Sequence, residues 1–191
     1  MREHHSPTVI VLAAGRGERF TRSGGATHKL DALLGGVPVL ERLLSRVAAS
    51  GLPWHVVRPR DDQLAAVDGM GDSIARGVAA TLGASGWLIL PGDLPLVEPQ
   101  SLLQVAQGLA AQPVVVPFWQ GRQGHPVGFA RECCTALMAL HGDVGAAAIV
   151  RAHHQAAAVL ELHLDDPGIV TDIDTREDLA RAEALLADPD V

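Results

Sequence analysis

The chain has 191 residues, which is enough for one domain that buries roughly two thirds of the surface exposed by its unfolded chain. The formal net charge of -7 and the 3% of aromatic residues argue against a broad nucleic-acid-binding surface, which needs positive charge and aromatic stacking platforms. Apolar residues make up 48% of the sequence, yet no apolar run approaches the ~20 residues of a membrane span.

Cysteine usage and the first residues indicate the cellular compartment. Cys133 and Cys134 are adjacent and so form no disulfide framework, which is typical of a reducing environment. Residues 1–7 are short and polar and do not have the pattern of a signal peptide. We therefore expect a cytoplasmic protein that binds a small ligand, with no nucleic acid and no membrane as a partner.

The first predicted element is a buried strand. Residues 9–12 form a continuous apolar run that is too short for a helix and rich in β-branched side chains. In the turn that follows, Gly15 and Gly17 allow the backbone to approach a ligand closely, so that consecutive N–H groups can bind an anion. Three cations surround this turn: Arg16, Arg19 and Lys29. In an acidic chain, such a gathering of cations favours a polyphosphate ligand.

Two common phosphate-binding patterns are absent from this turn. A dinucleotide fingerprint requires a small residue three positions after the second glycine, where this chain has Phe20. A P-loop requires a lysine between Gly and Ser or Thr, whereas Lys29 lies between His28 and Leu30. Hydride transfer with a dinucleotide cofactor therefore loses its main support.

Helices and strands alternate along the rest of the chain. The pattern predicts, in order, a helix that begins at Pro38 and ends at Gly51, a strand at 55–58, a loop or helix start at 60–63, a helix at 74–80 capped by Asp72 or Ser73, a strand at 87–90, a helix at 99–111 and a strand at 114–116. It then predicts a short strand at 127–129 that could run antiparallel, helices at 133–140 and 144–154, a strand at 159–164, and a final helix capped by Thr175 with Asp178 in the reciprocal position.

This alternation predicts a single domain over residues 1–191 with a three-layer α/β/α sandwich on a mostly parallel sheet. In such sheets, ligands bind outside the carboxyl ends of the strands, where the strand order reverses. The glycine-rich turn, Asp93 and Asp174 all follow apolar runs that we interpret as strands. We therefore expect them to converge on one crevice.

The pattern Leu-Ala-Ala-Gly-x-Gly-x-Arg-Phe at residues 12–20, followed by Lys29, resembles the signature of the nucleotidyltransferase superfamily. Members of this superfamily move a nucleoside monophosphate from an NTP onto a phosphate. That chemistry needs neutralisation of a triphosphate, a bridging metal and an acceptor phosphate held in line, and it needs no strong base because the acceptor is already anionic.

Two aspartates are candidate metal ligands. Magnesium is usually held by one or two carboxylates together with substrate phosphates. Asp93 is the first candidate, because Gly92 and Pro95 form a tight turn that presents its carboxylate, although such an aspartate can also serve only as a turn cap. Asp174 is the second. Strand alternation would place Asp172 on the same side as Asp174, so the choice between these two stays open.

Further polar residues are candidates for binding the substrates. Lys29 and Arg19 would offset the charge that accumulates on the pyrophosphate as the bond breaks. Asp72 and Ser73 could offer hydrogen bonds to a nucleobase, or serve only as helix caps. His125, in Gly-His-Pro, could donate to an acceptor phosphate or a pterin, or bond only to its own loop.

Six motifs stand in order along nearly the whole chain: residues 12–20 with Lys29, 71–73, 91–95, 124–126, 142–145 and 172–179. Together they resemble the molybdenum cofactor nucleotidyltransferases, and most closely the molybdenum cofactor cytidylyltransferases. The resemblance implies a Rossmann-like nucleotide-diphospho-sugar transferase fold and magnesium-dependent transfer of CMP from CTP to molybdopterin cofactor, with release of pyrophosphate. It implies that Lys29 and Arg19 contact phosphates and that Asp93 binds the metal.

The resemblance also concerns the nucleotide. Family members with Leu-Ala-Ala-Gly, as here, tend to use CTP, and those with Leu-Ala-Gly-Gly tend to use GTP. The nucleotide would be bound by Leu12, Ala13, Ala14, Gly15, Arg16 and Gly17, with Asp72 and Ser73. One departure is that the family lysine usually follows the Arg-Phe pair within a few residues and precedes a glycine, whereas residues 21–28 intervene here.

Other interpretations stay open. The acceptor could be another small phosphate, as in a cofactor guanylyltransferase or a sugar-phosphate enzyme. The chain could also be a non-catalytic nucleotide-binding chaperone that delivers cofactor, although the presence of Lys29, Asp93 and Asp174 argues against that. A molybdenum hydroxylase or its maturation factor is the partner that the resemblance implies.

Overall fold

The structure is a computed structural model that describes residues 6–15, 17–59 and 69–187. Arg16 and the predicted loop or helix start at 60–63 lie outside the described residues. Within them, none of the helices has the length and hydropathy to cross a membrane.

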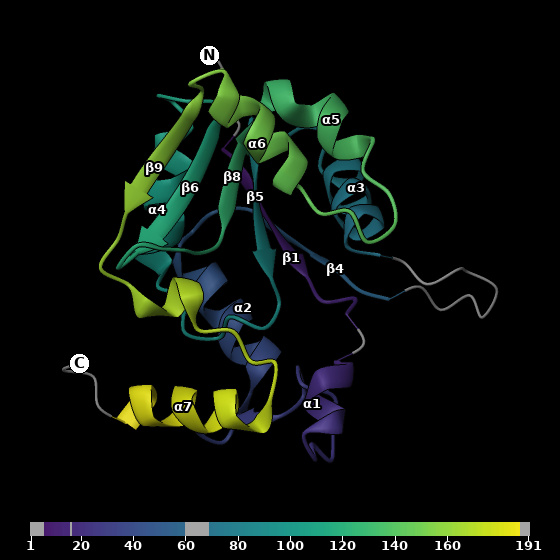
Figure 1. Cartoon of the computed structure of the whole chain (residues 1–191), viewed down its shortest axis with the longest axis vertical. Coiled ribbons are helices and arrows are strands. Elements are labelled where there is room, and N and C mark those ends of the chain that lie inside the picture. Colours follow the sequence, from purple (N-terminus) through teal and green to yellow (C-terminus); the bar gives the residue numbers. More distant parts are fainter. Residues whose placement is uncertain (1–5, 16, 60–68, 188–191) are drawn as a thin grey trace.

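A seven-stranded mixed sheet forms the centre of the molecule (Figure 1). Its strands are β1 (Thr8–Leu12), β4 (Trp54–Val57), β5 (Gly86–Pro91), β6 (Val114–Trp119), β7 (Arg122–Gln123), β8 (Val127–Ala130) and β9 (Val159–His163). The order is β4-β1-β5-β8-β6-β7, and β9 also pairs with β6. β1 runs parallel to β4 and β5, and β6 runs parallel to β9. β8 is antiparallel to both β5 and β6, so the expectation for 127–129 is confirmed.

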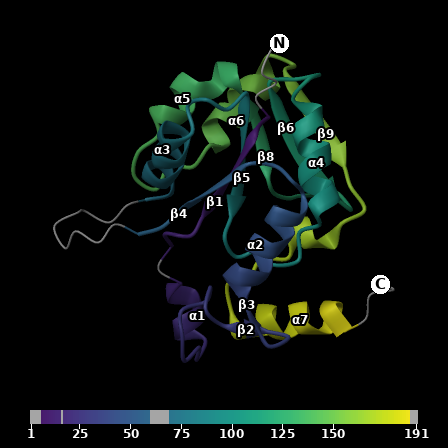
Figure 2. The same cartoon turned by 180° about the vertical axis from the view of Figure 1, so that it is seen from behind.

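Helices cover both faces of the sheet, which confirms the three-layer sandwich. On one face lie α2 (Val39–Ala49) and α4 (Pro99–Gly108), and on the other lie α3 (Met70–Ala80), α5 (Cys134–Met138) and α6 (Ala147–Gln155) (Figures 1 and 2). Alternate residues of β1 point to opposite faces of the sheet, so the strand contributes to a core on each face. Val9 and Val11 pack with Leu43 and Val47 of α2 on one face. Ile10 packs with α3 on the other.

A smaller unit lies beyond the carboxyl ends of β1 and β5 (Figure 1). It consists of α1 (Glu18–Arg22), the hairpin of β2 (Leu33–Leu34) and β3 (Val37–Pro38), and α7 (Arg176–Ala187). Phe20, Leu34 and Ala182 are buried in its core. The Thr175 cap of α7 is confirmed, because Thr175 N–H donates to Asp178 at 2.8 Å and Asp178 N–H donates to the Thr175 hydroxyl at 3.2 Å. This unit forms the floor of the crevice described below.

Several predicted boundaries are wrong. Pro38 is the N-cap of α2 rather than its first residue, α4 ends at Gly108, and α6 begins at Ala147. The predicted helix at 133–140 is shorter, because the 3-10 turn η1 (Arg131–Cys133) precedes α5.

The predicted caps of α3 are also wrong. The N-cap is Gly69, and Asp72 and Ser73 lie inside the first turn of the helix. A side chain at position 69 cannot fit, since a Cβ there would lie 2.0 Å from the carbonyl carbon of Gly142. The close approach of these two glycines therefore fixes where the helix begins.

The segment before α7 is not a strand. Pro167–Val170 forms the 3-10 helix η2, and residues 171–174 continue without strand pairing. Placing Asp174 at a strand end was therefore wrong, and strand alternation does not relate it to Asp172. The segment nevertheless reaches the crevice, because Ile173 N–H donates to the carbonyl of Asp93 at 2.9 Å.

Candidate functional site

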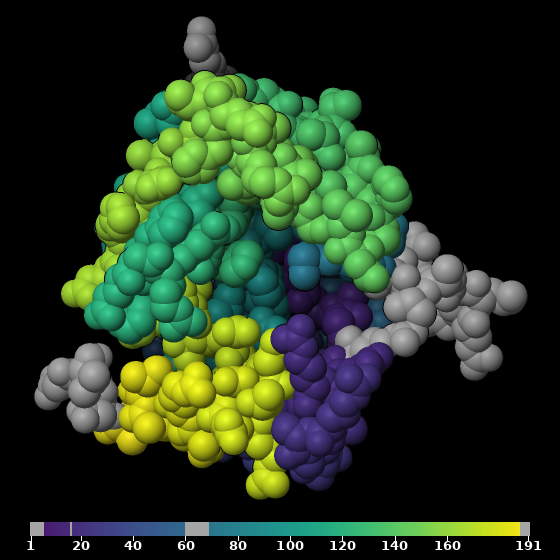
Figure 3. Space-filling model, viewed as in Figure 1, coloured from purple at the N-terminus to yellow at the C-terminus, as the bar shows by residue number. Residues whose placement is uncertain are grey.

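Two cavities open at the carboxyl ends of β1 and β5. One, about 430 Å³ in volume, lies against the glycine-rich turn and the start of α3, and we call it the glycine-loop cavity. The other, about 630 Å³, lies against the β6–β7 hairpin and the segment around Asp172, and we call it the hairpin cavity. Figure 3 shows the hollow between the N-terminal, central and C-terminal parts of the chain. Asp93 and Met70 line both cavities, so the two meet there.

Backbone hydrogen bonds bring two distant turns together. Ala13 N–H donates to Val57 at 2.9 Å, and Gly92 N–H donates to the carbonyl of Leu12 at 2.9 Å. Gly92 is required at this contact, because a Cβ on it would lie 2.8 Å from the Leu12 oxygen. The turn that carries Asp93 therefore lies beside the glycine-rich turn, as the sequence predicted.

The inserted residues 21–28 return the chain to the glycine-rich turn. Gly17 has a φ of +64°, and His28 Nε2 lies 2.8 Å from the Gly15 carbonyl oxygen. Farther along the insertion, the Ser23 hydroxyl accepts a hydrogen bond from the backbone N–H of Arg176 at the start of α7. Lys29 is thus placed next to the turn despite its sequence distance from Arg19.

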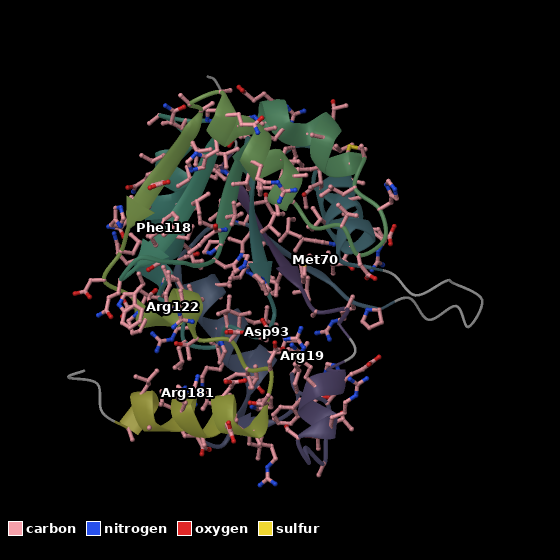
Figure 4. The ribbon with its side chains drawn as sticks, in the orientation of Figure 1. Arg19, Met70, Asp93, Phe118, Arg122 and Arg181 are labelled. Atoms are coloured by element: carbon pink, nitrogen blue, oxygen red, sulfur yellow. The ribbon has the colours of Figure 1, made fainter. Side chains whose placement is uncertain are left out.

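Lys29 lies at the centre of a charged cluster that includes Asp93 and Asp174, and Figure 4 labels Asp93 and the neighbouring Arg19. Its Nζ donates to Asp93 Oδ2 at 2.6 Å and to Asp174 Oδ1 at 2.8 Å. Arg19 Nη1 donates to the other oxygen of Asp174, Oδ2, at 2.8 Å. The side chains of Lys29 and Asp93 are 13% and 17% exposed, whereas that of Arg19 is 74% exposed. The structure therefore brings together the cations and carboxylates that the sequence singled out.

The cluster shifts the pKa values of its members. Burial alone lowers the pKa of Lys29, but the charge of Asp93 and the hydrogen bonds to both aspartates outweigh it, so that the pKa is raised above 10.5. Burial alone raises the pKa of Asp174, but the hydrogen bond and charge of Lys29, followed by Arg19, leave it below 3.8. Both groups are therefore charged at neutral pH.

The hairpin cavity contains two further predicted residues. Asp172 lines it without a cationic partner among the described residues, and burial with repulsion from Asp93 and Asp174 raises its pKa. The peptide bond from His125 to Pro126 is cis, and the backbone N–H of His125 donates to the carbonyl of Ile169 at 2.9 Å. Its ring Nδ1 is buried without a hydrogen-bond partner, and burial lowers the pKa of the imidazole, so the ring is neutral at pH 7.

Asp72 does not line either cavity. Its carboxylate accepts the backbone N–H groups of Gly69 at 3.0 Å and of Gly142 at 2.9 Å. It therefore ties the start of α3 to the loop that precedes α6. These contacts give the side chain a structural role, and its contact with a nucleobase stays a prediction.

The other predicted nucleotide-binding residues divide by position. Leu12, Ala14, Gly15 and Ser73 line the glycine-loop cavity. Gly17 lines the hairpin cavity, and Ala13 is buried in the core beneath the turn. The contact of each with a nucleotide stays a prediction.

The donor set fits a divalent ion that arrives with a triphosphate. Nowhere in residues 6–15, 17–59 and 69–187 do three or more His, Cys, Asp or Glu side chains form a ready cage for a metal. Asp93 and Asp174 both point one oxygen at the same ammonium, so they converge on a single position that a cation already favours. Magnesium characteristically takes one or two carboxylates and completes its coordination with phosphates and water.

Sequence reasoning missed several residues that line the cavities, among them Glu18, Met70 and Arg122. Each lies within three residues of one that was singled out, and Arg122 precedes His125 by three positions. Proximity in the sequence was the available signal, but only the folded loops show which side chains face the cavities.

This arrangement defines a class of protein: an α/β protein with cations and carboxylates gathered at the carboxyl ends of parallel strands, where two cavities meet and ligands of such sheets bind. The chain belongs to the MobA-like NTP transferase domain family, whose model matches residues 9–157.

Known proteins share the fold over most of their length. Rv0371c from Mycobacterium tuberculosis H37Rv superimposes with a TM-score of 0.70 at 25% identity, over 94% of this chain and 98% of that one. The same mycobacterial protein has been solved as a complex with manganese, with a TM-score of 0.66 at 24% identity, over 94% of this chain and 98% of that one. A nucleotidyl transferase from Methanothermobacter superimposes with a TM-score of 0.79 at 22% identity, over 97% of this chain and 99% of that one.

A curated relative is similar over a shorter region. The bifunctional protein GlmU of Coxiella burnetii is 30% identical over 116 residues, which cover 50% of this chain. The matched region spans 24% of the length of GlmU.

Proposed function

We propose that the protein transfers CMP from CTP to the phosphate of molybdopterin cofactor and releases pyrophosphate, in a reaction that requires Mg²⁺. The observation that carries this proposal is the position of the Lys29 cluster. Lys29, Asp93 and Asp174 stand where the glycine-loop cavity meets the hairpin cavity. A nucleotide tail from one side and an acceptor phosphate from the other would meet at this point.

The chain's own residues would act by position and charge. The backbone N–H groups of the glycine-rich turn receive phosphate oxygens, and Lys29 and Arg19 offset the negative charge that moves onto pyrophosphate when the bond to the α-phosphorus breaks. An oxygen of the acceptor phosphate forms the new bond to that phosphorus, and it needs no general base because it carries no proton. A magnesium ion held by Asp93 and Asp174 supplies neutralisation of the phosphate oxygens when it is bound.

The choice of substrates rests on sequence features and on the family. Ala13, Ala14 and Gly15 favour CTP through the resemblance described above. Gly124, His125 and Pro126 favour molybdopterin, and His125 lines the cavity that lies beyond Asp93. The manganese complex of Rv0371c supports a divalent ion in a related protein.

Exchange of radiolabelled pyrophosphate into each of the four NTPs, with and without molybdopterin, tests the proposal. We expect exchange into CTP that depends on molybdopterin and on Mg²⁺. Exchange that instead depends on a sugar phosphate, or that occurs into GTP, would replace the substrates named here. Tight NTP binding without exchange under any acceptor would indicate a non-catalytic cofactor chaperone and would overturn the proposed reaction.

A further inference from the structure

The guanidinium groups of the hairpin cavity differ in their partners. Three arginines line this cavity: Arg19, Arg22 and Arg122. Arg19 pairs with Asp174 at 2.8 Å, and Arg22 pairs with Glu18 at 2.7 Å. Arg122 has no carboxylate partner in the described ranges, and its one side-chain hydrogen bond is a long contact from Nη2 to the Val170 carbonyl at 3.4 Å. Within the part of the chain that the structure describes, it is therefore the arginine of this cavity without a carboxylate to neutralise its charge.

The backbone, rather than the side chain, fixes the position of Arg122. Arg122 pairs with Trp119 across the β6–β7 hairpin, and Gly124 N–H donates to Pro117 at 2.8 Å. Gly124 packs so closely on η2 that a Cβ would lie 2.6 Å from the Ile169 oxygen. The hairpin is thus anchored on both sides of residue 122. A change of this side chain should leave the loop in place.

The location of Arg122 separates it from the nucleotide. Arg122, labelled in Figure 4, lines the hairpin cavity but not the glycine-loop cavity. His125 and Asp172 line the same cavity. A planar guanidinium without a protein anion is suited to bidentate binding of phosphate or another oxyanion. Its charge would also attract an anionic ligand into a cavity whose floor is rich in carboxylates.

We propose that Arg122 binds an anionic group of the acceptor and so selects anionic acceptors over neutral ones. The inference depends on the proposed function only for the identity of the acceptor. It extends the site by a specificity-determining residue that acts on the acceptor and leaves the nucleotide unaffected.

The test compares Arg122→Gln, Arg122→Lys and a matched control, Arg151→Gln, which changes an exposed arginine on α6 that lines neither cavity. Calorimetry measures binding of CTP with Mg²⁺, then binding of molybdopterin to enzyme saturated with α,β-methylene-CTP. We expect Arg122→Gln to weaken molybdopterin binding about 10- to 100-fold, the range for losing one charge-assisted hydrogen-bonding group. Arg122→Lys should recover part of the loss, and CTP binding should stay unchanged in all variants.

Two results would overturn the inference. The first is an Arg122→Gln variant that binds molybdopterin as tightly as the unaltered protein. The second is an equal loss of CTP binding together with a lowered melting temperature, which would show a structural role. If the unaltered protein does not bind molybdopterin, the proposed substrate fails, and inorganic phosphate then serves as the probe of the same cavity. Weaker phosphate binding by Arg122→Gln would support Arg122 as an anion-binding residue, and equal binding would refute it.

Discussion

The two cavities that meet at Asp93 are lined by different sets of residues. The glycine-loop cavity is formed largely by two turns and the start of α3, and glycines and small side chains line it together with Lys29 and three carboxylates. The hairpin cavity draws charged and polar side chains from α1, the β6–β7 hairpin and the segment before α7. Backbone N–H groups can bind the phosphates common to every NTP whatever the sequence, whereas binding by side chains changes when those residues are substituted. Under the proposed function, we therefore predict that the fold fixes the nucleotide side and that the acceptor side can change between relatives.

The largest effect should come from Asp93, because it belongs to both cavities. Asp93→Asn keeps the shape of the side chain but removes the charge that faces Lys29 at 2.6 Å. We expect kcat for nucleotidyl transfer to fall by about 10³-fold or more, on the scale of losing a preorganised electrostatic contact to the transition state. Steady-state assays of pyrophosphate release with CTP and molybdopterin measure this change.

Asp165→Asn is the matched control, since Asp165 is exposed and lines neither cavity. Both variants should give circular dichroism spectra like that of the unaltered protein. Near-normal turnover by a folded Asp93→Asn variant would remove Asp93 from the metal site and with it the junction between the two cavities.

Asp72 offers a change that should affect the nucleotide side alone. Asp72→Ala leaves the N–H groups of Gly69 and Gly142 without their acceptor and releases the start of α3 from the neighbouring loop. Loss of such a cap costs about 1 kcal/mol, so the melting temperature should fall by about 2–4 °C. Because Gly69, Met70 and Ser73 line the glycine-loop cavity, we expect KM for CTP to rise about 10-fold.

The acceptor serves as the internal control for this prediction. KM for molybdopterin should change much less than KM for CTP in the Asp72→Ala variant. An equal rise in both values would mean that the two cavities are coupled through the loop and cannot be altered separately.

The same contrast explains what the sequence could and could not predict. The strand at residues 9–12, the glycine-rich turn and the turn at Asp93 were predictable because each is a contiguous pattern of small and apolar residues with local causes. The start of α3 was not predictable, because it depends on contact between Gly69 and Gly142, which are far apart in the sequence. Arg122 and Met70 escaped notice for a related reason, since only the packing of loops places their side chains in a cavity.

The choice between Asp172 and Asp174 as a candidate metal ligand also could not be predicted from the sequence. Alternation could not choose between Asp172 and Asp174, and it assumed a strand that the chain does not form. In the structure, Asp174 binds Lys29 and Arg19, whereas Asp172 lines the hairpin cavity and pairs with no cation of residues 6–15, 17–59 and 69–187. The choice depends on where η2 places the backbone, and no residue pattern in that segment encodes it.

The smallest expected effect is on stability. Replacing Asp174 and replacing Asp172 should change the free energy of unfolding in opposite directions. Asp174 has a folded-state pKa lowered from 3.8, so its charge stabilises the folded protein above that pH, and the contribution is lost as the pH falls through the folded pKa. Asp172 has a folded-state pKa raised above 3.8, so its ionised form destabilises the folded protein at neutral pH, and this cost is absent below 3.8.

At pH 7, Asp174→Asn should therefore lower the free energy of unfolding and Asp172→Asn should raise it. Each change should be no more than about 1 kcal/mol, since both carboxylates are partly screened by solvent. Urea unfolding of the metal-free protein at pH 7 and at successively lower pH measures both. The Asp172→Asn curve should approach that of the unaltered protein toward pH 3.8, and the Asp174→Asn curve should approach it only below 3.8. Shifts of the same sign at pH 7 would contradict this prediction and would mean that the cluster acts as one unit.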